Sequence, residues 1–193
     1  MIQQKNGFTL VEILVAFFLF VLILGGALGG VQQAVGFQRI TLERQAAIEE
    51  VSYAIEYISR AIRGAQKDTT GSCTAQVGRT FQYPGPQPFR FIDGNGKCRE
   101  FKRNVVGGQG FLEERISEDD TVGGFSGPGA IDWHRLISDD FNITNFLYHV
   151  RGAVDTERSQ PRVLFGITVS NKADTQDFLT VQTTMSTRQI DVP

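Results

Sequence analysis

Residues 8–31 read FTLVEILVAFFLFVLILGGALGGV, an almost uninterrupted apolar run. It contains one charged residue, Glu12, and one hydroxyl, Thr9. About 20 apolar residues are enough to cross a bilayer as a helix. A cleaved secretory signal would have a shorter apolar core followed by a small-x-small cleavage site. Here the small residues at positions 25–30 run without a polar break into a helical pattern, so we predict a retained membrane helix over residues 8–31.

The residues around the start of this stretch carry the functional information. Residues 1–7, MIQQKNG, contain one basic residue, Lys5, which with the initiator amine favours a cytoplasmic N-terminus. Glu12 needs an explanation, because a charge in a membrane helix costs roughly 2.5–3.5 kcal/mol. One interpretation places it near the interface, where the helix dipole favours an anion. The other is that cleavage after Gly7 creates an ammonium on Phe8, four residues away, that pairs with the carboxylate.

Gly7, Phe8, Glu12 and the uninterrupted apolar run resemble the class III signal of type IV pilins and pseudopilins. In that family a prepilin peptidase cuts after the glycine and N-methylates the new terminal residue, and the glutamate docks the subunit into a filament. The resemblance therefore implies a leader peptide of residues 1–7, cleavage between Gly7 and Phe8, N-methylation of Phe8 and an assembly role for Glu12.

The chain departs from many pilins because it has no proline midway along this helix. Gly25, Gly26, Gly29 and Gly30 could replace the kink by softening the helix, since each glycine costs about 1 kcal/mol relative to alanine. The alternative is close helix–helix packing of the small-xxx-small type. Both roles would serve assembly.

After Val31 the apolar pattern changes its period but stays helical. An apolar stripe recurs at spacings of three and four along one helix face, formed by Ile48, Val51, Ile55, Ile58 and Ile62. Gly64 and the polar run at 68–72 end the pattern. We predict a helix from about Phe8 to Arg63, about 80–85 Å long. Its amphipathic half, residues 32–66, would cover a sheet.

Residues 67–193 show strand and turn patterns. Phe89–Ile92 followed by Asp93-Gly94-Asn95-Gly96 predicts a hairpin. Further strands are expected at 98–102, 111–116 and 141–150, the last with a bulge at Thr144-Asn145, and residues 117–130 should form a loop. Two final strands should pair across a turn, with Val163, Phe165, Ile167 and Val169 opposite Leu179, Val181, Thr183 and Met185.

The predicted fold class is therefore α+β: a long N-terminal helix, transmembrane in its first half, packed on an antiparallel β-sheet domain. This order of elements resembles the minor pseudopilins of type II secretion, especially the J type, and the comparable minor pilins of type IV pili.

Composition excludes several classes of protein. The formal charge is −2 and the pI about 5.7, so there is no strong field towards nucleic acid, and no nucleic-acid partner is expected. Cys73 and Cys98 lack zinc-ligand spacing. Outside the cytoplasm they would form one disulfide; the alternative is two unpaired thiols.

We find no catalytic motif, and predict no enzyme, no catalytic residues, no cofactor and no metal site. His134 and His149 lack metal-ligand spacing. Asp93–Lys97 starts like a calcium loop but lacks the glycine at position six and the acid at position twelve, so a turn is favoured. Three adjacent acids at 118–120 are interpreted as a solvated loop, with calcium binding as the alternative.

The sequence thus predicts a minor pilin or pseudopilin, a structural subunit of a type IV pilus or a type II secretion-like filament. Its expected partners are a prepilin peptidase and other pilin-like subunits. Its expected location is the cytoplasmic (inner) membrane, crossed once, with the C-terminal domain outside the cytoplasm. The alternative is a pilus-displayed adhesin or ligand-binding module on the same helix, with Phe125, Trp133 or the Gly-rich loop as contacts.

Overall fold

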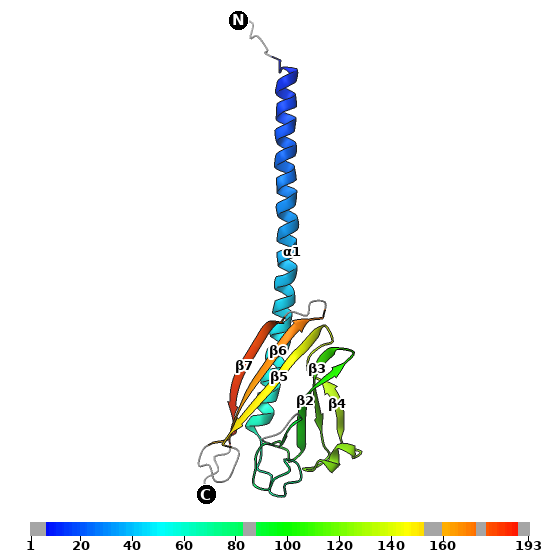
Figure 1. The fold of residues 1–193 in the computed structure, drawn as a ribbon, viewed down its shortest axis with the longest axis vertical. Coiled ribbons are helices and arrows are strands. Elements are labelled where there is room, and N and C mark those ends of the chain that lie inside the picture. The colour runs from blue at the N-terminus through cyan, green and yellow to red at the C-terminus, as the bar shows by residue number, and fades with distance from the viewer. Residues whose placement is uncertain (1–6, 83–87, 153–159, 173–176, 189–193) are drawn as a thin grey trace. The chain divides into compact units, whose positions relative to one another are not determined.

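The structure is a computed structural model that describes residues 7–82, 88–152, 160–172 and 177–188. The chain divides into two compact units, residues 1–45 and 46–193. Figure 1 shows the elements, which in chain order are α1 (Leu10–Arg63), β1 (Phe89–Ile92), β2 (Cys98–Val106), β3 (Gln109–Ile116), the 3-10 helix η1 (Gly123–Ser126), β4 (Ile131–Arg135), β5 (Phe141–Arg151), β6 (Arg162–Asn171) and β7 (Asp177–Ser186). The predicted α+β class is confirmed.

In the first unit, α1 begins at Leu10, two residues later than expected, because Thr9 lies before the first turn and caps it. Residues 7–42 are all exposed, and the apolar side chains among them surround the helix. A helix that is hydrophobic all round requires an apolar environment. Among the described residues, α1 is long and apolar enough to cross a membrane. The predicted boundaries at 7, 31 and 66 stay predictions.

In the second unit, α1 buries a stripe that differs from the predicted one. Its buried residues are Ala47, Val51, Ala54, Ile58, Ser59 and Ile62. Ile48 was expected in this stripe but is 47% exposed, and Ile55 is only partly buried. Six fully buried phenylalanines, five of them on strands of the two sheets, supply bulky rings to the same core, so two small alanines on the helix fill the remaining space. Apolar periodicity alone therefore placed the buried face slightly wrong.

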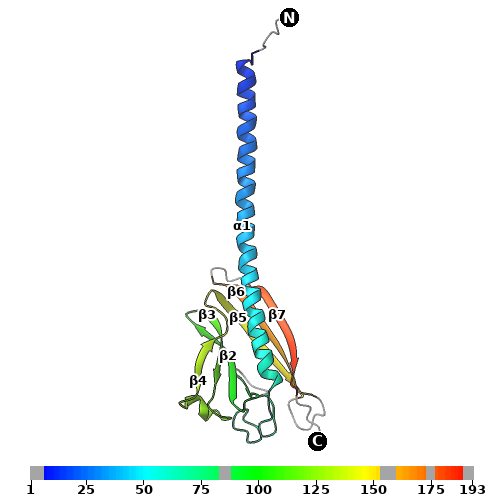
Figure 2. The ribbon, with the colours of Figure 1, turned by 180° about the vertical axis from the view of Figure 1, so that it is seen from behind.

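The strands form two antiparallel sheets, whereas one meander was expected. The first has the order β1-β2-β3-β4 and the second β5-β6-β7. Residues 46–63 of α1 lie across one face of the second sheet, behind it in Figure 1 and in front of it in Figure 2. The β1–β2 hairpin is confirmed, and so is the pairing of Val163, Phe165, Ile167 and Val169 with Met185, Thr183, Val181 and Leu179.

One strand was missed. Residues 131–135 read IDWHR, which offers no clean alternation of apolar and polar residues, yet they pair with β3 as the edge strand β4. The expected loop at 117–130 contains only the short helix η1.

The two sheets are joined at the predicted bulge of β5. The register between β5 and β6 shifts between Ile143 and Asn145. The Ile143 carbonyl accepts a hydrogen bond from the Arg103 guanidinium on β2. Beside it, the Gly110 N–H on β3 donates to Asn142 Oδ1 at 2.8 Å. A Cβ on Gly110 would lie 2.2 Å from the Ile143 oxygen, so only glycine permits this close approach.

Candidate functional site

The N-terminal segment that the sequence singled out is accessible in the structure. Gly7 and Phe8 precede α1, and the Phe8 side chain is 81% exposed. A Cβ built on Gly7 would meet nothing within 4 Å. Lys5 and the rest of the expected leader up to residue 6 lie outside the described residues. No described residue therefore covers the bond between Gly7 and Phe8.

Glu12 and Thr9 form a helix-capping arrangement. The Glu12 N–H donates to Thr9 Oγ1 at 3.3 Å, and the Thr9 N–H donates to Glu12 Oε2 at 3.4 Å. The Thr9 hydroxyl also donates to Glu12 Oε2 at 3.4 Å. This reciprocal pattern is a capping box, in which two N–H groups at the helix start gain side-chain acceptors. The capping box was not predicted above, although its sequence signal, Thr-x-x-Glu before an apolar run, is present in Thr9–Glu12.

The structure thus gives Glu12 a role that does not need a second chain. Its carboxylate lies in the first turn of α1, where it also complements the positive end of the helix dipole. The first interpretation of Glu12 is compatible with this geometry. Pairing with an ammonium on Phe8 requires cleavage, and it stays a prediction. Cleavage would place that ammonium on Phe8, one residue before Thr9 and four before Glu12.

The second unit contains the predicted disulfide. Cys73 and Cys98 are bonded, with Cα atoms 5.7 Å apart and a sequence separation of 25. Both are buried in a small cluster with Ile92, and Phe125 of η1 packs against it. The bond attaches the segment after α1 to the start of β2, as the sequence analysis expected for a domain outside the cytoplasm.

Asp68, which the sequence analysis did not single out, organises the loop that carries Cys73. Its Oδ2 accepts hydrogen bonds from the N–H groups of Cys73 at 3.0 Å and Thr74 at 2.7 Å, and from the Thr74 hydroxyl. Its Oδ1 accepts the Gly71 N–H at 2.7 Å. Burial works to raise the pKa of Asp68, but the hydrogen bonds from Thr74 and Cys73 outweigh it and hold the pKa below its ordinary value.

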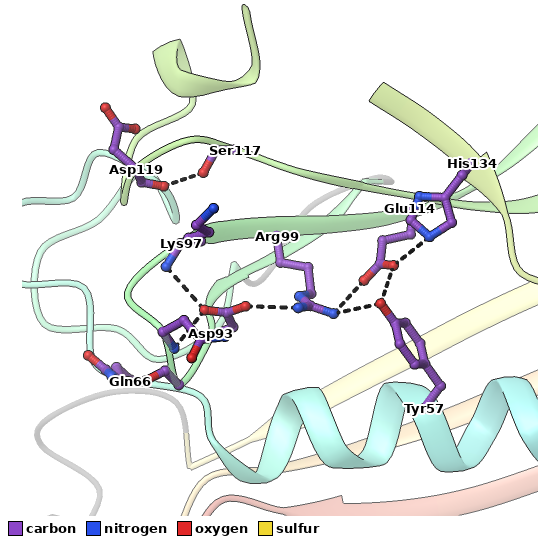
Figure 3. Close-up of polar contacts among 11 residues, drawn as sticks. Tyr57, Gln66, Asp93, Lys97, Arg99, Glu114, Ser117, Asp119 and His134 are labelled. Carbon is purple, nitrogen blue, oxygen red and sulfur yellow. Dashed lines mark hydrogen bonds and ion pairs between the residues drawn. The ribbon is translucent and has the colours of Figure 1, made fainter. Parts of the chain in front are cut away.

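A buried polar network joins α1 to the first sheet (Figure 3). Glu114 of β3 is fully buried and accepts hydrogen bonds from Tyr57 at 2.8 Å and Arg99 at 2.7 Å, and its Oε2 lies 2.9 Å from Nε2 of His134. Arg99 also bonds Asp93 at 2.9 Å. Burial raises the pKa of Tyr57, and its hydrogen bond to Glu114 raises it further. Because these groups contact one another, we infer that the network stabilises the fold.

Two of the acidic residues considered for metal binding accept hydrogen bonds from their own loops. Asp93 Oδ1 accepts the N–H groups of Asn95 and Lys97, which makes residues 93–97 a turn, the favoured interpretation. Asp119 Oδ1 accepts the N–H and hydroxyl of Thr121. Across the part of the chain that the structure describes, no three His, Cys, Asp or Glu residues are placed to hold a metal ion.

Comparison with known families gives one match. Residues 2–28 match the prokaryotic N-terminal methylation motif. Comparison with curated proteins and with solved structures gives no match. The motif and the long apolar N-terminal helix that follows together support a type IV pilin-like protein. They favour a structural subunit attached to a membrane over an enzyme.

Proposed function

We propose that this chain is a minor pilin or pseudopilin, a structural subunit of a type IV pilus or a type II secretion-like filament. One observation carries the proposal: the methylation motif at residues 2–28 opens directly into an apolar helix whose first turn contains Glu12. The motif supports processing by a prepilin peptidase, which we place after Gly7, with methylation of Phe8. The helix then inserts in the cytoplasmic membrane with the second unit outside the cytoplasm.

The second unit supports this proposal by its chemistry. A buried disulfide is suited to an oxidising compartment outside the cytoplasm. The ionisable groups at its centre, Glu114 and Arg99, are bonded to each other and to Tyr57 and Asp93, so they stabilise the fold. The alternative of an adhesin has weaker support, because Phe125 packs against the disulfide cluster and is not a free contact.

N-terminal processing gives the direct test. The full chain, produced with and without a prepilin peptidase, should lose residues 1–7 and gain one methyl group on Phe8 only when the peptidase is present. Intact-mass and N-terminal peptide analysis measure both changes. Gly7→Val should block the cut because a branched side chain replaces the hydrogen at the cleaved residue, and Gly36→Val should not. An unprocessed Met1, or a cut beyond Val31, would reject the proposal.

A further inference from the structure

The outer face of the first sheet carries two rows of charged residues that the proposed function does not use. Phe89, Phe91, Phe101 and Leu112 point into the core, so the alternate positions of β1–β3 form the outer face. In the strand register, Arg90 lies opposite Glu100, which lies opposite Arg115. Two residues along, Lys102 lies opposite Glu113, which lies opposite Arg135. Each row therefore reads cation, carboxylate, cation.

The carboxylates of both rows lie beneath their cations. The Glu100 side chain is 0% exposed and is bonded by both Arg90 and Arg115. The Glu113 side chain is 9% exposed, with Oε2 3.8 Å from Lys102 Nζ. The four flanking cations are between 21% and 40% exposed. Asp139, at the rim, pairs with Arg135. The charge that the rows present to solvent is therefore mainly positive.

Three of these four cations lie over aromatic rings. Lys102 Nζ lies 3.6 Å from the centroid of the Trp133 ring, and the Arg135 guanidinium 3.8 Å from that of Phe111. Arg115 lies 4.0 Å from the Phe125 ring and 4.7 Å from Trp133. Cations fixed over rings lose less side-chain freedom when they bind an anion. Because these rings already contact cations, they are poorly placed to stack on nucleic-acid bases.

The spacing of the rows indicates the form of the ligand. They lie two residues apart along β2 and β3, which is about 7 Å in a strand. Carboxylates on alternate residues of an extended peptide have the same spacing of about 7 Å. We propose that this face binds an extended acidic segment, of the pattern acid-x-acid, from another pilin-like subunit. Charge complementarity selects the acidic segment, and the identity of the partner rests on the proposed function.

The full chain in neutral detergent micelles can be tested with a short fluorescent peptide of alternating Glu and Thr, by anisotropy at low and high salt. A Gln-Thr peptide of the same length is the neutral control, and single-stranded oligo-dT tests nucleic acid. Lys102→Gln combined with Arg135→Gln removes the two cations of one row. Arg162→Gln removes an exposed cation from β6 of the other sheet and is the matched control.

The wild-type chain should bind the Glu-Thr peptide about fivefold more tightly than the Gln-Thr peptide at low salt, and the double substitution should remove that preference. Arg162→Gln should keep it. Lys102→Gln alone, which leaves Glu100 and its two arginines intact, gives a second measurement if the double variant unfolds. Equal binding of both peptides, or of wild type and double variant, would overturn the proposal. Tighter, row-dependent binding of oligo-dT would assign the face to nucleic acid instead. Failed N-terminal processing would reject the proposed function without changing peptide binding, so the two failures are distinguishable.

Discussion

Among single residues, Asp68 shows how one carboxylate fixes a loop. Its two oxygens accept four backbone N–H groups, from Thr70, Gly71, Cys73 and Thr74. These donors lie in a segment without regular structure, where backbone N–H groups need other acceptors. Because Cys73 is one of them, Asp68 also positions the cysteine that bonds Cys98.

Asp68→Asn should therefore destabilise the second unit at neutral pH, by about 2–3 kcal/mol, because the side-chain NH2 would face N–H donors. The folded-state pKa of Asp68 is lowered, so its contribution is present above its unfolded pKa of about 4 and is lost as pH falls through the folded pKa. Thermal unfolding across this pH range should show the gap between wild type and variant narrowing on acidification. Asp140→Asn, at an exposed position, is the control. A gap that stays constant with pH would contradict this assignment.

Among the elements, the contact between the two sheets depends on β3 and the bulge of β5. The β5–β6 register shifts just after Ile143, and the Arg103 side chain donates to the Ile143 carbonyl. Gly110 lets the backbones approach, and Gln109 Nε2 donates to the carbonyls of Asp139 and Phe141 at 2.7 and 3.1 Å. The bulge was predicted from the alternation of apolar residues. Its contacts with β2 and β3 could not be predicted in this way.

Gly110→Ala should lower the free energy of unfolding by about 1–3 kcal/mol, because its methyl group would overlap the Ile143 oxygen and push the sheets apart. Gly166→Ala in β6 is the matched control: its Cβ would lie 3.7 Å from the nearest side-chain atom, an ordinary contact. It should be neutral or raise stability by about 0.5–1 kcal/mol. Chemical denaturation of both variants measures the difference. Equal changes in the free energy of unfolding would mean that the close approach at Gly110 does not affect stability.

At the scale of the whole molecule, the proposed function depends on the Glu12 carboxylate in the first turn of α1. Glu12→Leu should leave membrane insertion intact or improve it, since leucine costs less than glutamate in lipid. It should reduce recovery of pilin-like partners about tenfold or more, because losing one member of an ion pair away from water costs about 3 kcal/mol. Pull-down of partner subunits from membranes, wild type against variant, measures assembly. Equal recovery would make Glu12 a tolerated interfacial charge.

Two further variants separate the possible roles of Glu12. Thr9→Ala removes the hydroxyl from the capping box but keeps the carboxylate, so assembly should persist. If Thr9→Ala loses partners as Glu12→Leu does, capping and not ion pairing explains the effect. Glu56→Leu removes an exposed acid from the second-unit part of α1 and should leave recovery unchanged.

The features that depend on local chemistry could be predicted from the sequence. An apolar run of membrane length predicts a helix in any context, and Gly7, Phe8 and Glu12 form a linear motif that matches over residues 2–28. Hairpin turns and alternating strands likewise follow from near neighbours, and the β5 bulge and the β6–β7 register were predicted this way.

The buried face of α1, the strand β4 and the Glu114 contacts appear only in the tertiary structure, because they depend on residues far along the chain. Ala47 and Ala54 replace Ile48 in the buried face since phenylalanines from distant strands fill the core. The polar strand β4 exists because β3 offers an open edge. The contacts that compensate for the burial of the Glu114 carboxylate come from Tyr57 on α1, Arg99 on β2 and His134 on β4. No sequence pattern around residue 114 predicts these contacts.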